Sequence, residues 1–326
     1  MEHSRRRRAD RRLRALHPAP GNEARGDAEE TVSIPFLKDD PLPPGEVQAV
    51  APGIRRILCG NPGPFTYRGT NTWIIGHGSD VAVLDPGPQD AAHLAAILRA
   101  TEGERITRIL VSHTHRDHSP GVAALQAATG AASLGFGPHL TPPDQGGEGG
   151  DHDFRPQVML PDGAALETDD WRLTALHTPG HCANHLCFAL ESDGTRGVLF
   201  SADHVMSWST SVVSPPDGDM AAYMRSLARL AARDDRIYLP GHGPPLPEPA
   251  PFVAALTAHR LEREAMVLDA LRAARRATAR ELVPPVYGPR LDDRLVPAAA
   301  RSLLAHLIKL AEEGAASRDG EQWEAR

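Results

Sequence analysis

The stretch SHTHRDHSPG, residues 112–121, constrains this 326-residue chain more than any other feature. Three histidines and an aspartate, all good metal ligands, fall within the six residues from His113 to His118. A helical zinc motif places its histidines at i and i+4 on one face, whereas these four ligands stand at i, i+2, i+4 and i+5. The run follows the apolar segment ILVS and precedes Pro120, a residue favoured in the first turn of a helix. We therefore expect a loop at the end of a strand that can turn its side chains toward one or two metal ions.

Three further segments have the same character, namely HTPGHCANH (177–185), FSADH (200–204) and LPGHG (239–243). Each follows an apolar, strand-like run and places a histidine or an aspartate where that run ends. One such segment would be weak evidence, but four in succession predict that several strand ends deliver ligands to one place.

Strand-like and helical patterns alternate from about residue 50 to residue 240, which indicates an α/β domain. After the proline-rich segment GHGPPLPEPAP the pattern becomes helical, with a long amphipathic segment over 252–276 and another over 295–314. We expect four parts: a disordered Arg-rich arm (1–30), the α/β domain (31–250), a small mainly helical domain (251–316) and a frayed tail (317–326).

Composition narrows the class of protein. No apolar stretch approaches the roughly 18 residues of a membrane span, and the basic N-terminus lacks the apolar core of a secretory signal. Three cysteines cannot build a disulfide framework. These features predict a cytoplasmic protein with no membrane partner.

Charge gives a weak indication about partners. Residues 31–256 contain 15 Lys/Arg and 25 Asp/Glu, a net charge of −10, whereas a protein that grips a polyanion usually has a clear basic face. One basic stretch, residues 271–280, has four arginines and no acid, and is either a phosphate contact or the solvated face of a helix: Arg272, Arg275, Arg276 and Arg280.

The order HxHxDH, HTPGH, a strand-end Asp and PGHG resembles the metallo-β-lactamase-fold hydrolases over roughly residues 45–250. The resemblance implies an αβ/βα sandwich of two sheets covered by helices, with the site at one edge of the sheets. Carried onto this sequence, it implies one metal bound by His113, His115 and His181. It also implies a second metal and a bridging carboxylate, supplied by Asp117, His118, His242 and Asp203.

This ligand set suits two Zn2+ ions per chain, with iron or manganese as alternatives. Two such ions can share a hydroxide that serves as the nucleophile, which removes the need for a protein base. We expect Asp117 and His185 to take part in catalysis; His185 would touch the substrate or donate a proton to the leaving group, with simple packing as the alternative. Asp85, at the end of the run VAVLDPG, is expected to accept a hydrogen bond from a metal-binding histidine.

The closest resemblance is to the lactamase-beta-like-2 group, whose C-terminal winged-helix-type domain the segment from His259 to Gly314 resembles. Some members of that group cleave single-stranded RNA, and related chains are thioesterases. We therefore expect a dinuclear zinc hydrolase whose substrate is either single-stranded RNA or a small thioester or ester. A glyoxalase II-like thioesterase and a mononuclear-iron sulfur dioxygenase are the alternatives, and a homodimer is left open.

The loop PFTYRGTNTW precedes the second predicted strand and resembles a lip over the site. It makes Tyr67 and Asn71 candidates for substrate contact. By contrast, we expect His177, Cys182 and His204 to have structural roles.

Overall fold

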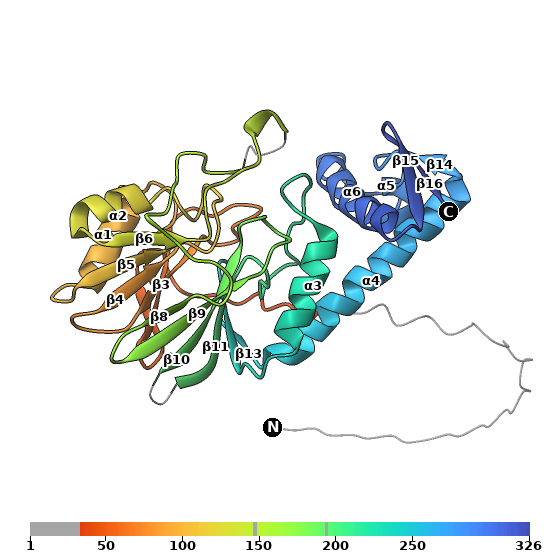
Figure 1. The fold of residues 1–326 in the computed structure, drawn as a ribbon. Coiled ribbons are helices and arrows are strands. Elements are labelled where there is room, and N and C mark those ends of the chain that lie inside the picture. The colour runs from red at the N-terminus through yellow and green to blue at the C-terminus, as the bar shows by residue number, and fades with distance from the viewer. Residues whose placement is uncertain (1–32, 146–148, 193–194) are drawn as a thin grey trace, which may run out of the picture. The chain divides into compact units, whose positions relative to one another are not determined.

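The computed structural model describes residues 33–145, 149–192 and 195–326. The predicted Arg-rich arm, residues 1–30, lies outside the described residues. Within the described residues two β-sheets pack face to face, and helices cover the outer surface of each sheet (Figure 1). The predicted α/β sandwich is therefore confirmed.

The first sheet has seven strands in sequence order, antiparallel from β1 to β4 and parallel from β4 to β7. Helices α1 (Ala91–Ala100) and α2 (Val122–Thr129) form the crossovers from β4 to β5 and from β5 to β6. Gly130 caps α2 in the left-handed conformation. The strands are β1 (Val47–Ala51), β2 (Ile54–Leu58), β3 (Asn71–Ile75), β4 (Val81–Leu84), β5 (Ile106–Leu110), β6 (Ala132–Gly135) and β7 (Val158–Met159).

The second sheet has six strands in the order β13-β12-β11-β10-β9-β8. Strands β11 and β12 run parallel within it, and α3 (Met220–Ala231) connects them. The strands of this sheet are β8 (Ala165–Glu167), β9 (Trp171–His177), β10 (Leu186–Ser192), β11 (Thr195–Ala202), β12 (Ile237–Pro240) and β13 (Leu246–Pro247).

Alternation along the strands explains the layered packing. On β3, Trp73 and Ile75 face the core between the sheets, while Ile74 joins the core beneath α1 and α2. On β11, Phe200 faces Trp73 with ring centroids 5.8 Å apart, and Leu199 turns to the helix side. Because successive strand side chains point to opposite faces, strands that are apolar throughout are buried on both faces.

Helix α4 (Pro249–Ala274) belongs to both parts of the chain. Phe252 and Leu256 near its start pack into the core beneath the second sheet, whereas Val267 and Leu271 near its end pack into a separate C-terminal core. At 26 residues the helix is about 39 Å long, which lets it reach both cores. The predicted boundary between residues 250 and 251 therefore falls inside one continuous helix.

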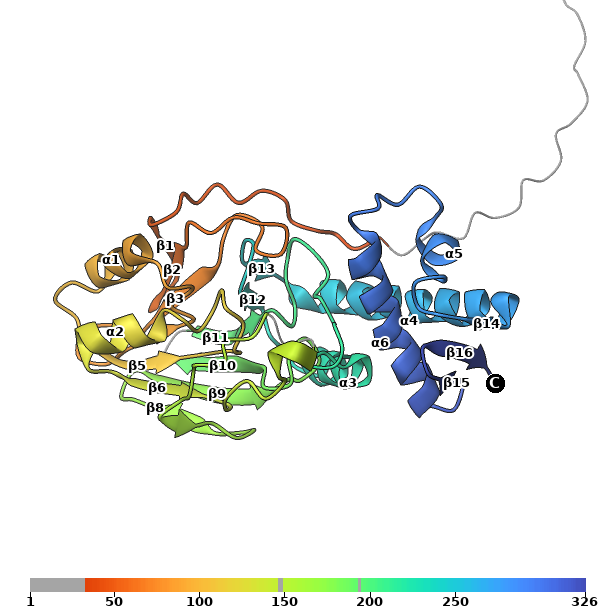
Figure 2. The ribbon, with the colours of Figure 1, turned by 90° about the horizontal axis from the view of Figure 1, so that it is seen from above.

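The C-terminal part combines helices with a small sheet (Figure 2). Besides the end of α4 it contains two helices and three short strands: α5 (Val283–Tyr287), α6 (Val296–Glu312), β14 (Arg276–Ala277), β15 (Ala316–Asp319) and β16 (Gln322–Ala325). A further short element, the 3-10 turn η1 (Pro143–Gln145), lies in the α/β part of the chain.

The prediction that residues 317–326 fray is wrong. They form most of an antiparallel hairpin that also pairs with β14. Trp323 anchors the hairpin, since its side chain is 2% exposed in the C-terminal core. Burial of so large an aromatic group outweighs the cost of ordering a short polar hairpin.

No helix among the described residues combines the length and the apolar character needed to cross a bilayer.

Candidate metal centre

The predicted ligands occupy loops that follow four strands. His113, His115, Asp117 and His118 lie between β5 and α2, and the other three side chains follow β9, β11 and β12: His181, Asp203 and His242. Their ligand atoms form three overlapping groups, each with all atoms within 4.8 Å of one another. The structure thus brings together all seven residues singled out from the sequence.

The first group consists of His113, His115 and His181. His115 Nδ1 lies 3.0 Å from His113 Nε2 and 3.0 Å from His181 Nε2. Three ring nitrogens therefore meet at one point, and His115 takes part through Nδ1 where the other two use Nε2.

Hydrogen bonds on the far side of the His113 and His181 rings determine which ring nitrogen carries the proton and which keeps its lone pair toward the cluster. His181 Nδ1 lies 2.6 Å from the carbonyl oxygen of Val212, to which only an N–H can donate. His113 Nδ1 lies 3.0 Å from Ser112 Oγ, whose own hydroxyl donates to Asp85. A neutral imidazole that donates from Nδ1 keeps a lone pair on Nε2, so the Nε2 lone pairs of His113 and His181 both face His115 Nδ1.

The second group consists of Asp117, His118 and His242. His242 Nε2 lies 3.2 Å from Asp117 Oδ2, and His118 Nε2 lies 3.6 Å from the same oxygen. His242 donates from Nδ1 to the carbonyl of Gly69 at 3.1 Å. His118 Nδ1 lies 3.0 Å from Asp85 Oδ2. Here too the outer nitrogen is held by an acceptor and Nε2 faces inward.

Asp203 lies between the two groups. Its Oδ2 is 3.6 Å from His181 Nε2 and 3.4 Å from His242 Nε2, and its Oδ1 is 3.6 Å from His118 Nε2. Asp203 Oδ1, His118 Nε2 and His242 Nε2 are buried and have no hydrogen-bond partner among the described residues. Unpaired buried polar atoms are costly, and a divalent cation between them would satisfy all three.

Asp85 occupies the place expected of it behind the ligands. It adopts a positive φ of 52°, which is uncommon for a residue other than glycine. Its carboxylate accepts from the backbone N–H and the hydroxyl of Ser112 at 2.7 and 2.6 Å, as well as from His118. One buried carboxylate thus orients His118 directly and His113 through Ser112, the arrangement typical of metal-binding histidines.

Opposing electrostatic effects set the protonation of the cluster. Burial and the neighbouring His181 lower the pKa of His115 to about 3, so at neutral pH the ring is uncharged and one of its nitrogens keeps a lone pair. Burial also disfavours charge on His242, but the carboxylates of Asp203 and Asp117 outweigh it and raise the pKa to about 10. In Asp203, His242 and His118 overcome burial and hold the carboxyl pKa well below its usual value.

Gly241, between β12 and His242, allows the site to close. A Cβ atom on it would lie 2.3 Å from Asp203 Oδ1 and 2.9 Å from His118 Cε1. Any side chain there would push apart two ligands, so the glycine of the PGHG motif is required by the approach of the backbone. Ala202 adopts a positive φ of 43° directly before Asp203.

These observations test whether a metal fits. Four histidines have one nitrogen hydrogen-bonded away from the cluster and the other facing it, and the carboxylates stand among the inward nitrogens. Imidazole and carboxylate donors suit zinc, iron or manganese. The residues present therefore fit a pair of divalent metal ions, with His115 and Asp117 on the more open side of the cluster; the Asp117 side chain is 27% exposed.

His185 does not lie where a substrate contact or proton donor would. Its side chain is fully buried, and its Nε2 accepts a hydrogen bond from the backbone N–H of Asp203 at 3.3 Å. Its Nδ1 donates to Thr178 Oγ1 at 2.9 Å. The prediction of a direct catalytic role is wrong, because the ring packs behind Asp203 and supports the loop that presents it.

Tyr67 and Asn71 also differ from the prediction of substrate contact. Asn71 is buried, and its amide donates to the carbonyls of Pro240 and Gly243 at 2.9 and 2.8 Å, which fixes the loop around His242. Tyr67 stacks on Trp208 with ring centroids 4.8 Å apart and donates to the carbonyl of Lys38. Both residues hold loops in place.

The remaining structural expectations agree with the packing. His177 stacks on Phe136 at 4.0 Å, and its Nε2 donates to the carbonyl of Ala183. His204 is fully buried with its ring 4.6 Å from that of Tyr223. Cys182 is buried, and its Sγ donates to Asn184 Oδ1 at 3.1 Å, although the Sγ also lies within 4.8 Å of ligand atoms of His115 and Asp217.

Sequence reasoning missed the supporting groups supplied by Ser112, Val212 and Gly69. The last two contribute only backbone carbonyls, which no residue type reveals. Ser112 directly precedes His113, and its position next to the ligand motif was the one available signal.

Two family profiles match the chain. Residues 65–242, more than half of the chain, match the Metallo-beta-lactamase superfamily, and residues 278–323 match the Beta-lactamase associated winged helix domain. The second match ends inside β16, consistent with a hairpin in this domain.

Curated relatives are similar over most of their length. A protein named atrochrysone carboxyl ACP thioesterase from Aspergillus chevalieri is 32% identical over 287 residues, which cover 83% of this chain and 84% of the relative. A lactamase-like protein, adaB, from Aspergillus niger is 31% identical over 296 residues, which cover 86% of this chain and 87% of the relative.

Solved structures share the fold at lower identity. A beta-lactamase domain protein from Burkholderia ambifaria superposes with a TM-score of 0.73 at 24% identity, covering 89% of this chain and 96% of that one. A metallo-beta-lactamase family protein from Thermus thermophilus gives a TM-score of 0.70 at 24% identity, covering 85% of this chain and all of that one. Together with the profile matches and the relatives, these likenesses place the chain in the metallo-beta-lactamase superfamily, as a hydrolase with the C-terminal winged-helix domain associated with that superfamily.

Proposed function

We propose that this hydrolase cleaves acyl thioesters carried on an acyl-carrier thiol, and that it does so with two Zn2+ ions. The observation that supports a hydrolytic metal centre is the set of inward-facing histidine nitrogens around Asp203, whose Oδ1 has no hydrogen-bond partner among the described residues. The thioester substrate is supported by relatives named as ACP thioesterases that match this chain along most of its length.

The metal pair would supply Lewis acidity and a water molecule acidic enough to be deprotonated at neutral pH. His113, His115 and His181 would hold one ion, and Asp117, His118 and His242 the other, with Asp203 shared between them. Asp85 and the carbonyls of Val212 and Gly69 keep the rings in the tautomers that expose these nitrogens.

Asp117 is suited to orienting water at the open side of the site. Although burial opposes ionisation, His118 and His242 hold the pKa of Asp117 below its ordinary value, so the carboxylate stays charged. A carboxylate with so low a proton affinity accepts a hydrogen bond from the attacking water but does not store its proton. Its role is therefore positioning in addition to ligation.

The alternative RNA substrate loses one of its supports. Arg272 pairs with Asp269 at 3.1 Å, and Arg276 pairs with Asp319 at 2.8 Å and Glu324 at 3.4 Å. Two of the four arginines in residues 271–280 are thus neutralised by carboxylates, whereas RNA binding depends on free cations that meet phosphates.

The test is hydrolysis of an acyl-pantetheine thioester by the zinc-loaded protein, followed by detection of the released thiol. We expect turnover that a chelator abolishes and added zinc restores. Labelled single-stranded RNA is the second substrate in the same assay. Metal-dependent RNA cleavage with no thioester turnover would contradict the proposal.

A further inference from the structure

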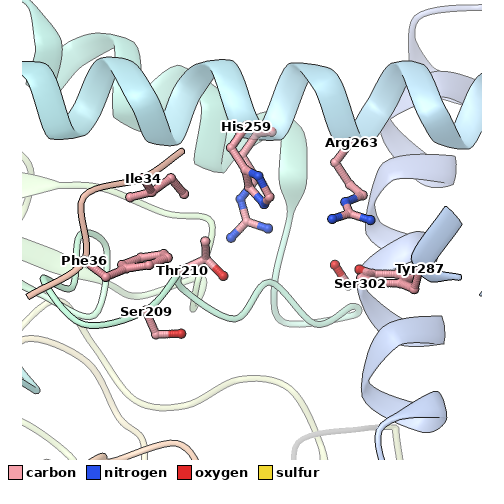
Figure 3. A pocket seen from close by; sticks show the side chains of 9 residues that line it. Ile34, Phe36, Ser209, Thr210, His259, Arg263, Tyr287 and Ser302 are labelled. Carbon is pink, nitrogen blue, oxygen red and sulfur yellow. The ribbon is translucent and has the colours of Figure 1, made fainter. Parts of the chain in front are cut away.

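A half-open cavity of about 390 Å3 is lined by three parts of the chain. Helices α4 to α6 form one wall, the segment at residues 34–36 another, and the loop at residues 209–210 the third (Figure 3). Its size suits one small chemical group with part of an attached chain, far less than a strand of nucleic acid.

Two arginines three residues apart on α4, Arg260 and Arg263, line this cavity and contribute positive charge to it. Arg260 is only 5% exposed, and its Nη2 donates to the carbonyl of Ser211. Its Nε is buried without a hydrogen-bond partner among the described residues. Arg263 donates to the carbonyl of Val286 at 3.1 Å and lies 4.3 Å from the ring centre of Tyr287. Neither guanidinium forms an ion pair with a described carboxylate.

The titratable side chains near the two arginines agree with a positive electrostatic potential in the cavity. Burial, followed by the charges of Arg260 and Arg263, lowers the pKa of His259, which also lines the cavity. Two acids lie nearby on α4: Glu262, whose charge opposes the lowering of the His259 pKa, and Glu264, which Lys309 engages at 2.7 Å; neither lines the cavity. Buried cations are normally paired, so this cavity lacks a negative partner.

The cavity walls around the arginines contain both apolar and polar side chains. Figure 3 shows Ile34 and Phe36 on one side and Arg263, Tyr287 and Ser302 on the opposite side. No described lining residue is an acid. An anionic group with an aliphatic attachment fits this division, since the arginines and Ser302 can donate to the anion while Ile34 and Phe36 contact the hydrocarbon.

The same loop connects the cavity to the metal centre. Ser209 and Thr210 line the cavity, and Ser211 accepts from Arg260. The next residue, Val212, accepts from His181 Nδ1 at 2.6 Å. Four consecutive residues therefore separate a cationic cavity on one side from a metal-binding histidine on the other.

We propose that this cavity binds the 4′-phosphate of a phosphopantetheine arm, the thiol carrier of the acyl group, with the branched aliphatic carbons next to that phosphate against Ile34 and Phe36. The inference rests on the proposed thioesterase function. Arginine forks match the oxygen geometry of phosphate and bind it through several charged hydrogen bonds. Coenzyme A and carrier proteins share this phosphorylated arm.

The first experiment compares one acyl group on pantetheine and on pantetheine 4′-phosphate. We expect kcat/KM to be at least about tenfold higher for the phosphorylated thioester, as loss of one or more charged hydrogen bonds predicts. Equal values for the two thioesters would overturn the inference. Adding the coenzyme A thioester and a carrier-protein thioester shows which source of the arm is preferred, and both should exceed unphosphorylated pantetheine.

A matched pair of variants isolates the cavity. Ser302→Asp places a carboxylate against the arginines and should reduce the phosphate preference to about one. Ser302→Asn has nearly the same shape without the charge and should keep the preference. If Asn and Asp behave alike, the phosphate is not held in this cavity.

A second pair on α4 tests the cation itself. Arg263→Gln should lower the preference for the phosphorylated thioester, and Arg263→Lys should restore part of it. Arg272→Gln, on the same helix but paired with Asp269 in solvent, should leave the preference intact. An equal loss in Arg272→Gln would contradict the assignment to this cavity.

Calorimetry with pantetheine 4′-phosphate separates the two proposals. If the zinc-loaded protein hydrolyses no thioester, the proposed function fails. Binding that Ser302→Asp weakens at least about tenfold and Ser302→Asn preserves would still support the cavity. Absence of binding together with thioester turnover would overturn the inference and leave the proposed function standing.

Discussion

Two buried clusters of titratable side chains, one in each part of the chain, are built on opposite principles. In the winged-helix part, Glu264 accepts from Lys309 at 2.7 Å and from His306 at 3.4 Å, so a carboxylate meets a cation and an imidazole N–H. In the metal centre, His113 and His181 turn lone pairs toward His115 Nδ1, and Asp203 Oδ1 has no hydrogen-bond partner among the described residues. The first arrangement stabilises the folded chain unaided, whereas the second is complete only with bound cations.

The largest effect is expected from Asp203→Asn, because Asp203 stands between both halves of the centre. Loss of its charge should lower thioester turnover at least about a thousandfold, the cost of several kcal/mol of transition-state stabilisation. Asp162→Asn removes an exposed carboxylate paired with Arg229 and serves as the control. Steady-state kinetics of the two zinc-loaded variants make the comparison, and similar turnover in both would remove Asp203 from the account.

Asp85→Asn should have a smaller effect that appears in metal binding. The amide of Asn is uncharged and has one acceptor oxygen, so it holds Ser112 and His118 less firmly than the Asp85 carboxylate does. Zinc affinity should therefore fall about 10- to 100-fold. Competition with a chromogenic chelator measures this affinity. Asp80→Asn, which removes a carboxylate paired with Arg108 away from the ligands, should leave affinity unchanged.

Glu264→Gln should affect stability and not metal binding. The substitution leaves Lys309, which is 8% exposed, without its principal charged acceptor. We expect the free energy of unfolding to fall by about 2 kcal/mol, measured by urea denaturation of the zinc-loaded protein. A loss of bound zinc in this variant would break the contrast between the clusters.

The smallest expected effect is the contribution of His93 to the pH dependence of folding stability. Burial lowers its pKa to about 4, while Nε2 stays within 2.7 Å of Thr72 Oγ1. Because the unfolded chain takes up a proton near pH 6.5 that the folded chain does not, stability is lost as pH falls from about 6.5 toward 4. Relative to pH 7.5, His93→Gln should lose about 1 kcal/mol less than wild type at pH 5.5. Parallel pH profiles would show that His93 does not contribute.

The sequence predicted which side chains meet at the site because they belong to short motifs directly after apolar strands. His113 to His118 are fixed relative to one another by chain continuity, and the parallel strands β11 and β12 bring the ends with Asp203 and His242 together. The orientation of each ring was not predictable, because it depends on carbonyls of Gly69 and Val212 that are far away in sequence. The role of His185 failed for a related reason, since only packing reveals that it lies behind Asp203.

The C-terminal hairpin shows a different limit. Its strands are short and polar, so neither alternation nor apolar content distinguishes them from a frayed end. Two signals were nevertheless present in SRDGEQWEA: Gly320, which takes a positive φ of 63° in a two-residue hairpin loop, and the single large aromatic Trp323. A turn signal beside one buried aromatic group would have been enough to predict the wing.

The most direct test of the central claim is the zinc content of the protein after reconstitution and removal of loosely bound metal. Two zinc ions per wild-type chain, with fewer in Asp203→Asn and no change in Glu264→Gln, would agree with a centre whose inward lone pairs need two cations. Wild-type protein that folds, stays monodisperse and retains no zinc, iron or manganese would contradict it.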